Sequence, residues 1–177
     1  MFKTLLKVRN QFTKFCWILF NFFLNLTNRF AMDDLLRAIK ATKDIKDDIP
    51  SQIEEGLYLG SVEAANNKAL LKSLNITHIL TVASSVPPAY PNDFTYKTFD
   101  SKRTGNVLVH CFAGRSRSVT VVVAYMMKTH GMSSYEALNL VKRKRSVAAP
   151  NAGFILQLQS YEKSLPGMLW FYVENGS

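Results

Sequence analysis

One stretch of the sequence joins a buried strand to a buried helix through a short polar loop. The strand is "VLVHC" (107–111), the loop is "FAGRSRS" (112–118), and the apolar helix that follows is closed by Gly131. Because so short a loop must turn at Gly114, its backbone N–H groups can converge on one point at the helix N-terminus. The sequence therefore predicts an anion-binding loop within an α/β domain.

The side chains of this loop suit the transfer of a phosphoryl group. The field that binds an oxyanion also favours the thiolate form of Cys111, which is the nucleophilic form. Arg117 has a planar guanidinium that can bind two phosphoryl oxygens, which a lysine cannot do. Ser118 can donate a hydrogen bond to the thiolate, and His110 is expected to orient the loop. A buried inert cysteine is the alternative, but it leaves Gly114 and Arg117 without a purpose.

These residues resemble the H-C-x5-R-S signature of the cysteine-dependent protein tyrosine phosphatases. "HCFAGRSRS", "GLYLG", "AYMM" and "APNAGF" are similar to the compact dual-specificity phosphatases, especially to plant-type members that act on MAP kinases. The resemblance implies hydrolysis of phosphotyrosine, and of phosphoserine or phosphothreonine, through a phosphocysteine intermediate. It implies no cofactor and no metal.

The resemblance also assigns roles to numbered residues. Cys111 would be the nucleophile, and Ser118 would assist the second step. His110 and Asn151 would support the loop. The phosphate site would comprise six consecutive residues, namely Phe112, Ala113, Gly114, Arg115, Ser116 and Arg117.

Apolar patterning divides the chain into four parts. The domain of residues 49–165 shows strands at 56–60, 77–84 and 107–111, a helix at 63–74, and helices starting at Ser133 and Asn151. It is predicted to be an α/β fold with a phosphatase-like, mostly parallel central sheet and flanking helices. A basic hydrophobic leader (1–31) and an amphipathic helix (32–48) precede it, and an apolar tail (166–177) follows.

The part of the chain that should supply a general acid is too short. In the resembled family an aspartate follows the strand that corresponds to "FTYKTF" (94–99), and a helix then leads into the cysteine strand. Here only "DSKRTGN" (100–106) remains, whereas a parallel crossover with a helix needs about ten to twelve residues. Asp100 is the nearest candidate acid, and Asp93 precedes the strand and lies at its wrong end. For both residues, the alternative interpretation is a surface carboxylate without a catalytic role.

Three interpretations of the domain follow from this shortfall. The first is a phosphatase whose activity is impaired and which favours phosphotyrosine, because a phenol leaves unaided more readily than an alkoxide. The second is a pseudophosphatase that binds phosphoproteins without efficient turnover. The third is a shortened product that folds poorly because apolar surface is left bare.

The flanking segments and the charge raise further alternatives. Residues 1–31 hold an apolar run (15–26) shorter than the ~20 residues that cross a bilayer, so they predict either weak membrane association or an extension upstream of a start at Met32. The helix within 33–46 could dock a calmodulin-like partner or pack on the domain. A net charge of +9 could attract phosphorylated substrates, but the dispersed cations argue against nucleic acid.

Cysteine content and one basic run give predictions about where in the cell the protein is found. Cys16 and Cys111 are the two cysteines of the chain and suggest no disulfide framework, so a reducing compartment, the cytoplasm, is expected. The run "KRKR" (142–145) could add nuclear localisation or act as a docking patch, and a solvated helix face is the alternative.

Overall fold

The computed structural model describes residues 47–84, 86–96 and 105–165. Its strands are β1 (Ser51–Glu54), β2 (Leu57–Gly60), β3 (Ile76–Thr81), β4 (Thr95–Tyr96) and β5 (Asn106–His110). Its helices are α3 (Val62–Asn66), α4 (Lys68–Ser73), α5 (Arg117–His130), α6 (Ser134–Lys144) and α7 (Ala152–Ser164). The predictions for the leader, for the docking helix within 33–46 and for the tail fall outside the described residues.

The strands form one sheet in the order β1-β2-β5-β3-β4. The β1–β2 pair is antiparallel, and every other pair is parallel, which confirms the mostly parallel sheet. β5 lies in the middle, where His110 is level with Gly60 of β2 and with Thr81 of β3. Because ligands of such sheets bind beyond the carboxyl ends of the strands, this register places Cys111 at the expected position.

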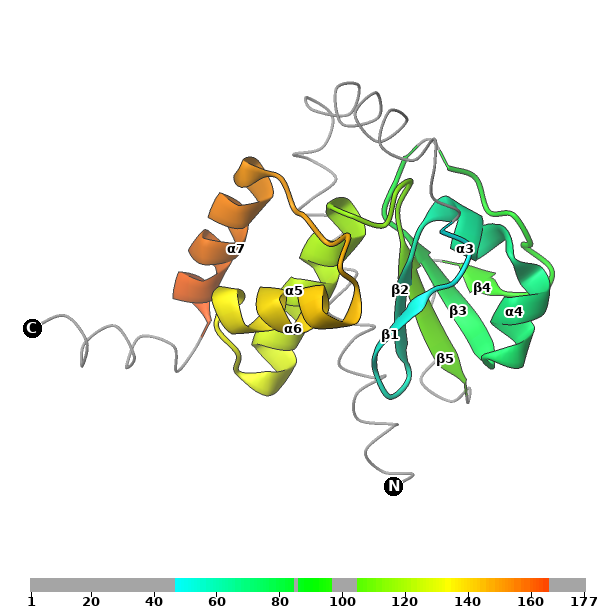
Figure 1. The fold of residues 1–177 in the computed structure, drawn as a ribbon, viewed down its shortest axis with the longest axis horizontal. Helices are drawn as coiled ribbons and strands as arrows, with labels where there is room; N and C mark the ends of the chain where they lie inside the picture. The colour runs from blue at the N-terminus through cyan, green and yellow to red at the C-terminus, as the bar shows by residue number, and fades with distance from the viewer. Residues whose placement is uncertain (1–46, 85, 97–104, 166–177) are drawn as a thin grey trace, which may run out of the picture.

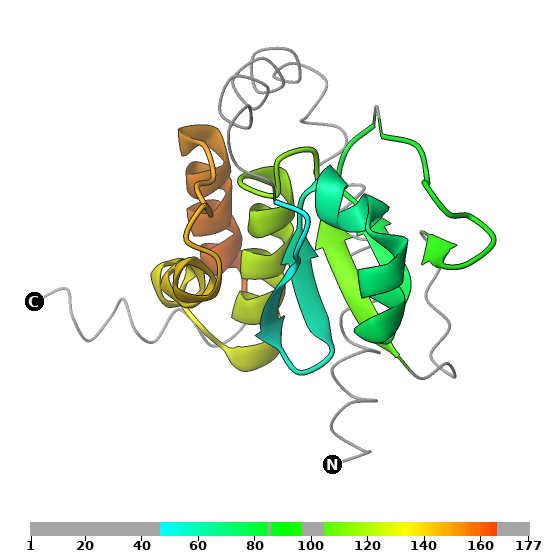
Figure 2. The ribbon, with the colours of Figure 1, turned by 45° about the vertical axis from the view of Figure 1, so that its right-hand side comes forward.

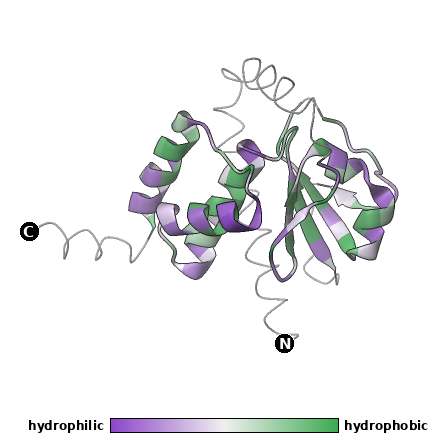
Figure 3. Cartoon of the chain, viewed as in Figure 1, coloured by the Kyte–Doolittle hydropathy of each residue, from purple (hydrophilic) through white to green (hydrophobic). Residues whose placement is uncertain are grey.

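Helices cover both faces of the sheet. α5, α6 and α7 lie on one side and α3 and α4 on the other, as Figures 1 and 2 show. α5 is the most enclosed, with every residue from Ser118 to Met127 buried, as expected for a helix that is apolar nearly all round. Figure 3 shows the same concentration of hydrophobic residues on α5 and the central strands. None of the helices in the described ranges is long and apolar enough to span a membrane.

The predicted ends of the helices on this face are confirmed. α5 ends at Gly131, which has a left-handed conformation with φ 66°. Ser133 and Glu136 form a capping box at the start of α6. The side chain of Asn151 caps α7 by accepting a hydrogen bond from the Phe154 amide over 2.8 Å. These caps satisfy amide groups that have no partner within their helices.

The opposite face differs from the prediction in one respect. The single helix expected at 63–74 is two short helices, because Asn67 ends α3 and begins α4. The Asn67 backbone N–H donates to Ala64, while its side chain accepts from the Leu70 amide at 3.3 Å. Asparagine competes with the helical backbone in this way and therefore favours a break. Leu71 of α4 is buried in the core of this face.

The connection between β4 and β5 is the unusual feature of the sheet. The two strands lie on opposite sides of β3, so the chain must cross β3 between them. Only residues 97–105 make this connection, which is fewer than the roughly ten to twelve residues of a crossover that includes a helix. The described residues therefore form a three-layer α/β sandwich in which too few residues separate β4 from β5 for a crossover that includes a helix.

Candidate active site

Cys111 lies at the floor of the loop between β5 and α5. Its side chain is 3% exposed, and the Ser118 hydroxyl donates a hydrogen bond to Sγ across 3.2 Å. Ser118 is fully buried in the first turn of α5. The sulfur is thus held at the N-terminal end of a helix of 14 residues, where the helix dipole favours negative charge.

Four carbonyl groups of the loop accept hydrogen bonds from the surrounding protein. The Phe112 carbonyl binds the Val62 amide at 3.0 Å, and the Arg115 carbonyl binds the Ala149 amide at 2.7 Å. The Gly114 carbonyl accepts from Arg145 Nε at 2.8 Å. The Ser116 carbonyl accepts from the amide and the hydroxyl of Thr120, each at 2.9 Å. The loop carbonyls are therefore fixed from the outside.

The amide groups of the loop are oriented by these contacts. A trans peptide unit points its N–H away from its C=O, and no cis peptide occurs in the described residues. Fixing the carbonyls of Phe112, Gly114, Arg115 and Ser116 therefore orients the next amide in each case. No amide of residues 112–117 donates a backbone hydrogen bond to another described residue. These donors are free for an oxyanion above Cys111.

Gly114 is required at the turn of the loop. Its φ of 59° lies in the left-handed region, and a Cβ atom there would approach the Gly60 carbonyl oxygen and Arg145 Nη2 to 2.5 Å. The Gly60 atom belongs to the backbone of β2 and cannot move cheaply. The sequence prediction that the backbone turns at Gly114 is confirmed.

Arg117 is the first residue of α5 and is half-buried. Its guanidinium forms no hydrogen bond or ion pair with another residue of the described ranges. A guanidinium in this position, one turn from free amide groups, can bind two oxygens of a phosphate. The neighbouring Arg115 is also half-buried, and its backbone carbonyl ties the loop to Ala149.

His110 is buried and neutral. The residue is 2% exposed, and Nε2 shares a hydrogen bond of 2.8 Å with the Thr81 hydroxyl of β3. Burial lowers the pKa of His110 to about 4, and the backbone of Cys111 offsets only part of this effect. A neutral imidazole at pH 7 holds no proton that it could readily donate as an acid. The His110 side chain therefore joins β5 to β3, and its predicted role in orienting the loop stays a prediction.

Asn151 and Ser116 join the loop to α7. The Asn151 amide donates to the Ser116 hydroxyl at 3.2 Å, while its own side chain caps α7. Asn151 is therefore in contact with the loop, and its supporting role stays a prediction.

The structure describes one of the two candidate general acids, Asp93. Asp100 lies outside the described residues. Asp93 is held by Lys68 at 2.6 Å and by Lys72 at 2.7 Å, both on α4, and it precedes β4. Hydrogen bonds from these two ammonium groups lower the pKa of Asp93. A carboxylate that is paired, ionised and placed before the edge strand is unsuited to donate a proton beyond the carboxyl end of β5.

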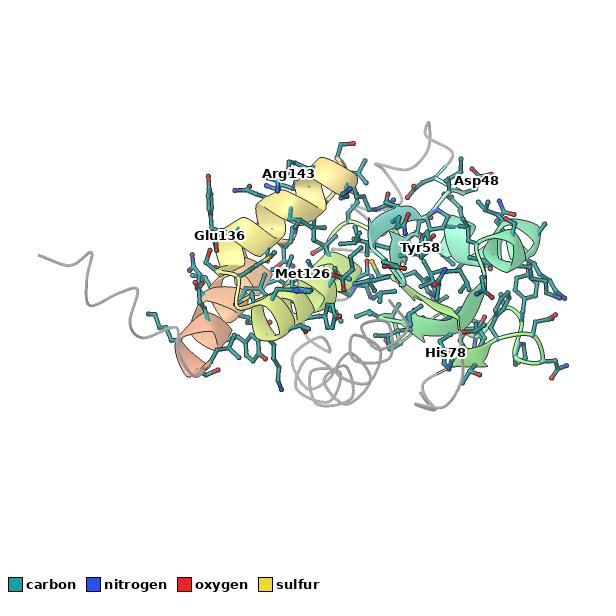
Figure 4. All side chains as sticks on the ribbon, turned by 90° about the horizontal axis from the view of Figure 1, so that it is seen from below. Asp48, Tyr58, His78, Met126, Glu136 and Arg143 are labelled. Atoms are coloured by element: carbon teal, nitrogen blue, oxygen red, sulfur yellow. The ribbon has the colours of Figure 1, made fainter. Side chains whose placement is uncertain are left out.

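Arg145 is a residue of the site that sequence reasoning missed. It belongs to the basic run 142–145, for which the sequence predicts a nuclear signal, a docking patch or a solvated helix face. Lys142, Arg143 and Lys144 are indeed exposed, and Figure 4 shows Arg143 on the outside of α6, away from buried Met126. Arg145, by contrast, is 5% exposed and contacts the loop. Spacing alone gave no signal, because the four cations are consecutive.

Known proteins similar to the chain identify its family. It is 55% identical to dual specificity protein phosphatase 1 of Arabidopsis thaliana over an alignment of 155 residues that covers 74% of this chain and 78% of the relative. The chain belongs to the dual specificity protein phosphatase family. Dual specificity protein phosphatase 1B of the same plant is 50% identical over an alignment of 140 residues that covers 66% of this chain and 84% of the relative. Residues 97–164 also match the family described as "Dual specificity phosphatase, catalytic domain".

Solved structures of this phosphatase family share the fold. The human tyrosine phosphatase-like serine/threonine/tyrosine-interacting protein matches with a TM-score of 0.60 and 31% identity, over 65% of this chain and 96% of that one. A mouse putative dual specificity phosphatase complexed with zinc tungstate matches with a TM-score of 0.59 and 29% identity, over 67% and 92%. The predicted fold class and family are thereby confirmed.

The alignments also show that this phosphatase is shorter than its relatives within the aligned region. The 155 residues aligned with the first relative correspond to 74% of this chain, which is about 131 of its 177 residues. Roughly 24 residues of that relative therefore have no counterpart here. The second relative gives nearly the same difference, with 140 aligned residues against about 117. A difference of this size is about that of a helix with its loops.

Proposed function

We propose that this chain is a protein phosphatase that hydrolyses phosphotyrosine through a phosphocysteine intermediate on Cys111. The observation that carries the proposal is the buried sulfur of Cys111, 3.2 Å from the Ser118 hydroxyl and below a loop whose amides are free to bind an oxyanion. The tungstate bound in the mouse relative is likewise a tetrahedral oxyanion, like the phosphate proposed here.

Two steps complete the proposed reaction. First, the Cys111 thiolate forms a bond to phosphorus, the bond from phosphorus to the tyrosine oxygen breaks, and the oxygen leaves with its electron pair and takes up a proton. Then water attacks phosphorus, the S–P bond breaks, and inorganic phosphate and the thiolate are released. Amides of residues 112–117 and the Arg117 guanidinium bind the phosphoryl oxygens in both steps. The Ser118 hydroxyl stabilises the thiolate as the second step forms it.

The proton for the leaving oxygen determines which substrates react. The region that would hold a general acid is shortened, and Asp93 is committed to Lys68 and Lys72. Tyrosine, with a phenol pKa near 10, leaves without an acid far better than serine or threonine. General acid catalysis contributes about 100- to 10,000-fold. We therefore infer strong discrimination in favour of phosphotyrosine, and we retain Asp100 as the candidate for any residual protonation.

Relatives suggest the class of protein substrate. The MAP kinase phosphatase with leucine-rich repeats protein 3 of Dictyostelium discoideum is 39% identical over 140 residues, although the match covers only 16% of that protein. Phosphorylated MAP kinases in the cytoplasm are accordingly the proposed substrates. The net charge of +9 favours association with acidic phosphoproteins.

A second candidate function is a phosphoprotein-binding module without efficient turnover. Two observations favour it: the similarity to the human phosphatase-like interacting protein, and the roughly 24 residues that the chain lacks relative to the Arabidopsis phosphatase. Both functions use the same phosphate loop, and they differ in whether Cys111 performs chemistry.

Turnover of two peptides separates these functions. A phosphotyrosine peptide and a phosphothreonine peptide of the same sequence are offered to the chain and to Cys111→Ser. We expect turnover of the phosphotyrosine peptide that depends on Cys111, with the phosphothreonine peptide at least about 100-fold slower. Binding of both peptides by a well-folded sample, with no turnover that Cys111→Ser removes, would favour the binding module instead.

A further inference from the structure

Arg145 is a buried cation that donates hydrogen bonds to Gly114, to Asp47 and, at 3.5 Å, to the Ser51 hydroxyl. Its guanidinium donates through Nε to the Gly114 carbonyl at 2.8 Å and through Nη1 to Asp47 Oδ1 at 3.1 Å, and Nη2 pairs closely with Asp47 Oδ2. A buried charge is tolerated only when it is paired and hydrogen-bonded in this way. Arg145 thus joins the turn of the phosphate loop to a carboxylate that is 98 positions away in the sequence.

Asp47 is itself fixed beside the loop. Its carbonyl accepts a hydrogen bond from the Ser61 hydroxyl at 2.7 Å. Ser61 caps α3, and the next residue, Val62, donates its amide to the Phe112 carbonyl at 3.0 Å. The segment that enters the domain and the end of β2 therefore reach the same loop. Asp47 is anchored independently of Arg145, which allows it to hold the guanidinium in place.

We propose that Arg145, held by Asp47, is a positioning residue that sets the orientation of the phosphate loop. The peptide unit between Gly114 and Arg115 carries the carbonyl that Arg145 binds and the amide of Arg115 on its opposite side. Without the guanidinium, this unit is free to rotate and the Arg115 amide no longer points toward the phosphate position. This inference rests on the proposed function, because it assumes that the amides bind an oxyanion.

The Gly114 carbonyl depends on this contact more than its neighbours do. The carbonyls of Phe112, Arg115 and Ser116 are held by backbone amides of Val62, Ala149 and Thr120, which no substitution other than proline removes. Gly114 is held by a side chain, and as a glycine with φ 59° it has more conformational freedom than any other loop residue. The turn at Gly114 therefore has a positive φ and a carbonyl whose orientation depends on the buried guanidinium of Arg145.

The test measures tungstate binding to the full chain by isothermal titration calorimetry, with thermal unfolding recorded for each variant. Asp47→Asn removes the charge that holds the guanidinium. Arg145→Lys retains a cation but cannot donate to Gly114 and to both oxygens of Asp47 at once. We expect each variant to bind tungstate about tenfold or more weakly, because small displacements of binding groups are costly. Asp47→Glu should recover part of the affinity.

Asp93→Asn is the matched control. Asp93 also pairs with two cations, Lys68 and Lys72, but it lies on the α4 side of the sheet. This control should bind tungstate as the unaltered chain does, even where its melting temperature falls. The double variant of Asp47 and Arg145 should be no weaker than the weaker single variant, since the two residues act as one unit.

The possible results are distinct. Unaltered tungstate affinity in both folded variants, with or without a lower melting temperature, would overturn the inference and leave a purely structural ion pair. If Asp47→Asn does not fold, the affinity of Arg145→Lys decides in the same way. No tungstate binding by the unaltered, folded chain would overturn the proposed function, and the positioning role with it.

Discussion

The Ser118 hydroxyl donates a hydrogen bond to the Cys111 sulfur across 3.2 Å in the buried first turn of α5. Neither side chain is exposed, so water does not compete for this contact from outside. A hydrogen bond to a charged partner contributes about 1.5–3 kcal/mol, and it counts most when the sulfur carries a full negative charge. In the proposed reaction that charge develops as the phosphocysteine is hydrolysed.

Ser118→Ala is therefore expected to slow the second step more than the first. We predict a kcat about 10- to 100-fold lower, with an initial burst of released phenol as the phosphocysteine accumulates. Stopped-flow measurement with an aryl phosphate checks this. Ser73→Ala, which removes an exposed hydroxyl bound to the Leu70 carbonyl, is the control and should leave both steps unchanged. Equal slowing of the burst and of the steady state by Ser118→Ala would contradict the prediction.

Alanine substitutions at Gly114 and Gly131 distinguish the cost of backbone strain from the cost of steric crowding. Both have positive φ, 59° and 66°, but a Cβ at Gly114 meets the Gly60 carbonyl oxygen at 2.5 Å, whereas a Cβ at Gly131 meets nothing within 4 Å. Gly131→Ala should cost about 1 kcal/mol of unfolding free energy. Gly114→Ala should cost clearly more and should abolish tungstate binding. Urea denaturation checks both values, and equal costs would show that crowding at Gly114 is unimportant.

Arg117→Lys retains the positive charge but loses the planar fork. We predict that kcat/KM for a phosphotyrosine peptide falls by about 100- to 1,000-fold, as when one donor to a developing oxyanion is removed. The control is Arg143→Lys, on the outer side of α6 (Figure 4), which should leave kcat/KM unchanged. A loss below threefold in Arg117→Lys would mean that Arg117 acts only through its charge.

His110 makes the stability of the domain depend on pH. Its pKa is about 4 in the folded protein against 6.5 for the free side chain, so the unfolded chain takes up a proton first as the pH falls. Stability is therefore full above about pH 6.5 and declines toward pH 4, by up to about 3 kcal/mol. His110→Gln should flatten this decline. Urea denaturation at several pH values measures it, and identical slopes for the two proteins would refute the assignment.

The parts of the fold that could be predicted from the sequence are determined by residues close together in the chain. Helix α5 was predictable because apolar residues fill it and Gly131 ends it, and the capping box of Ser133 and Glu136 is a local pattern. The phosphate loop was predictable because Cys111 and Arg117 lie at a fixed spacing around a glycine. In each case the residues that determine the structure are neighbours in the chain.

The features that sequence missed depend on distant or weak signals. β1 has Ile53 as its one buried residue, so its strand pattern is faint, and it forms by pairing with β2. Asn67 breaks a helix whose apolar pattern continues through it. Arg145 is distinguished from the adjacent exposed cations only by its partners, Gly114 and Asp47. No local pattern reports contacts across such separations.

The central claim is that Cys111 carries the phosphoryl group, and trapping of the intermediate tests it most directly. The chain and Ser118→Ala are mixed with a phosphotyrosine peptide and quenched in acid within one turnover, and mass spectrometry then locates the phosphate. We predict phosphate on Cys111 in both proteins, with a larger fraction in Ser118→Ala. Turnover by a folded sample without phosphate on Cys111, or turnover that survives Cys111→Ser, would contradict the claim.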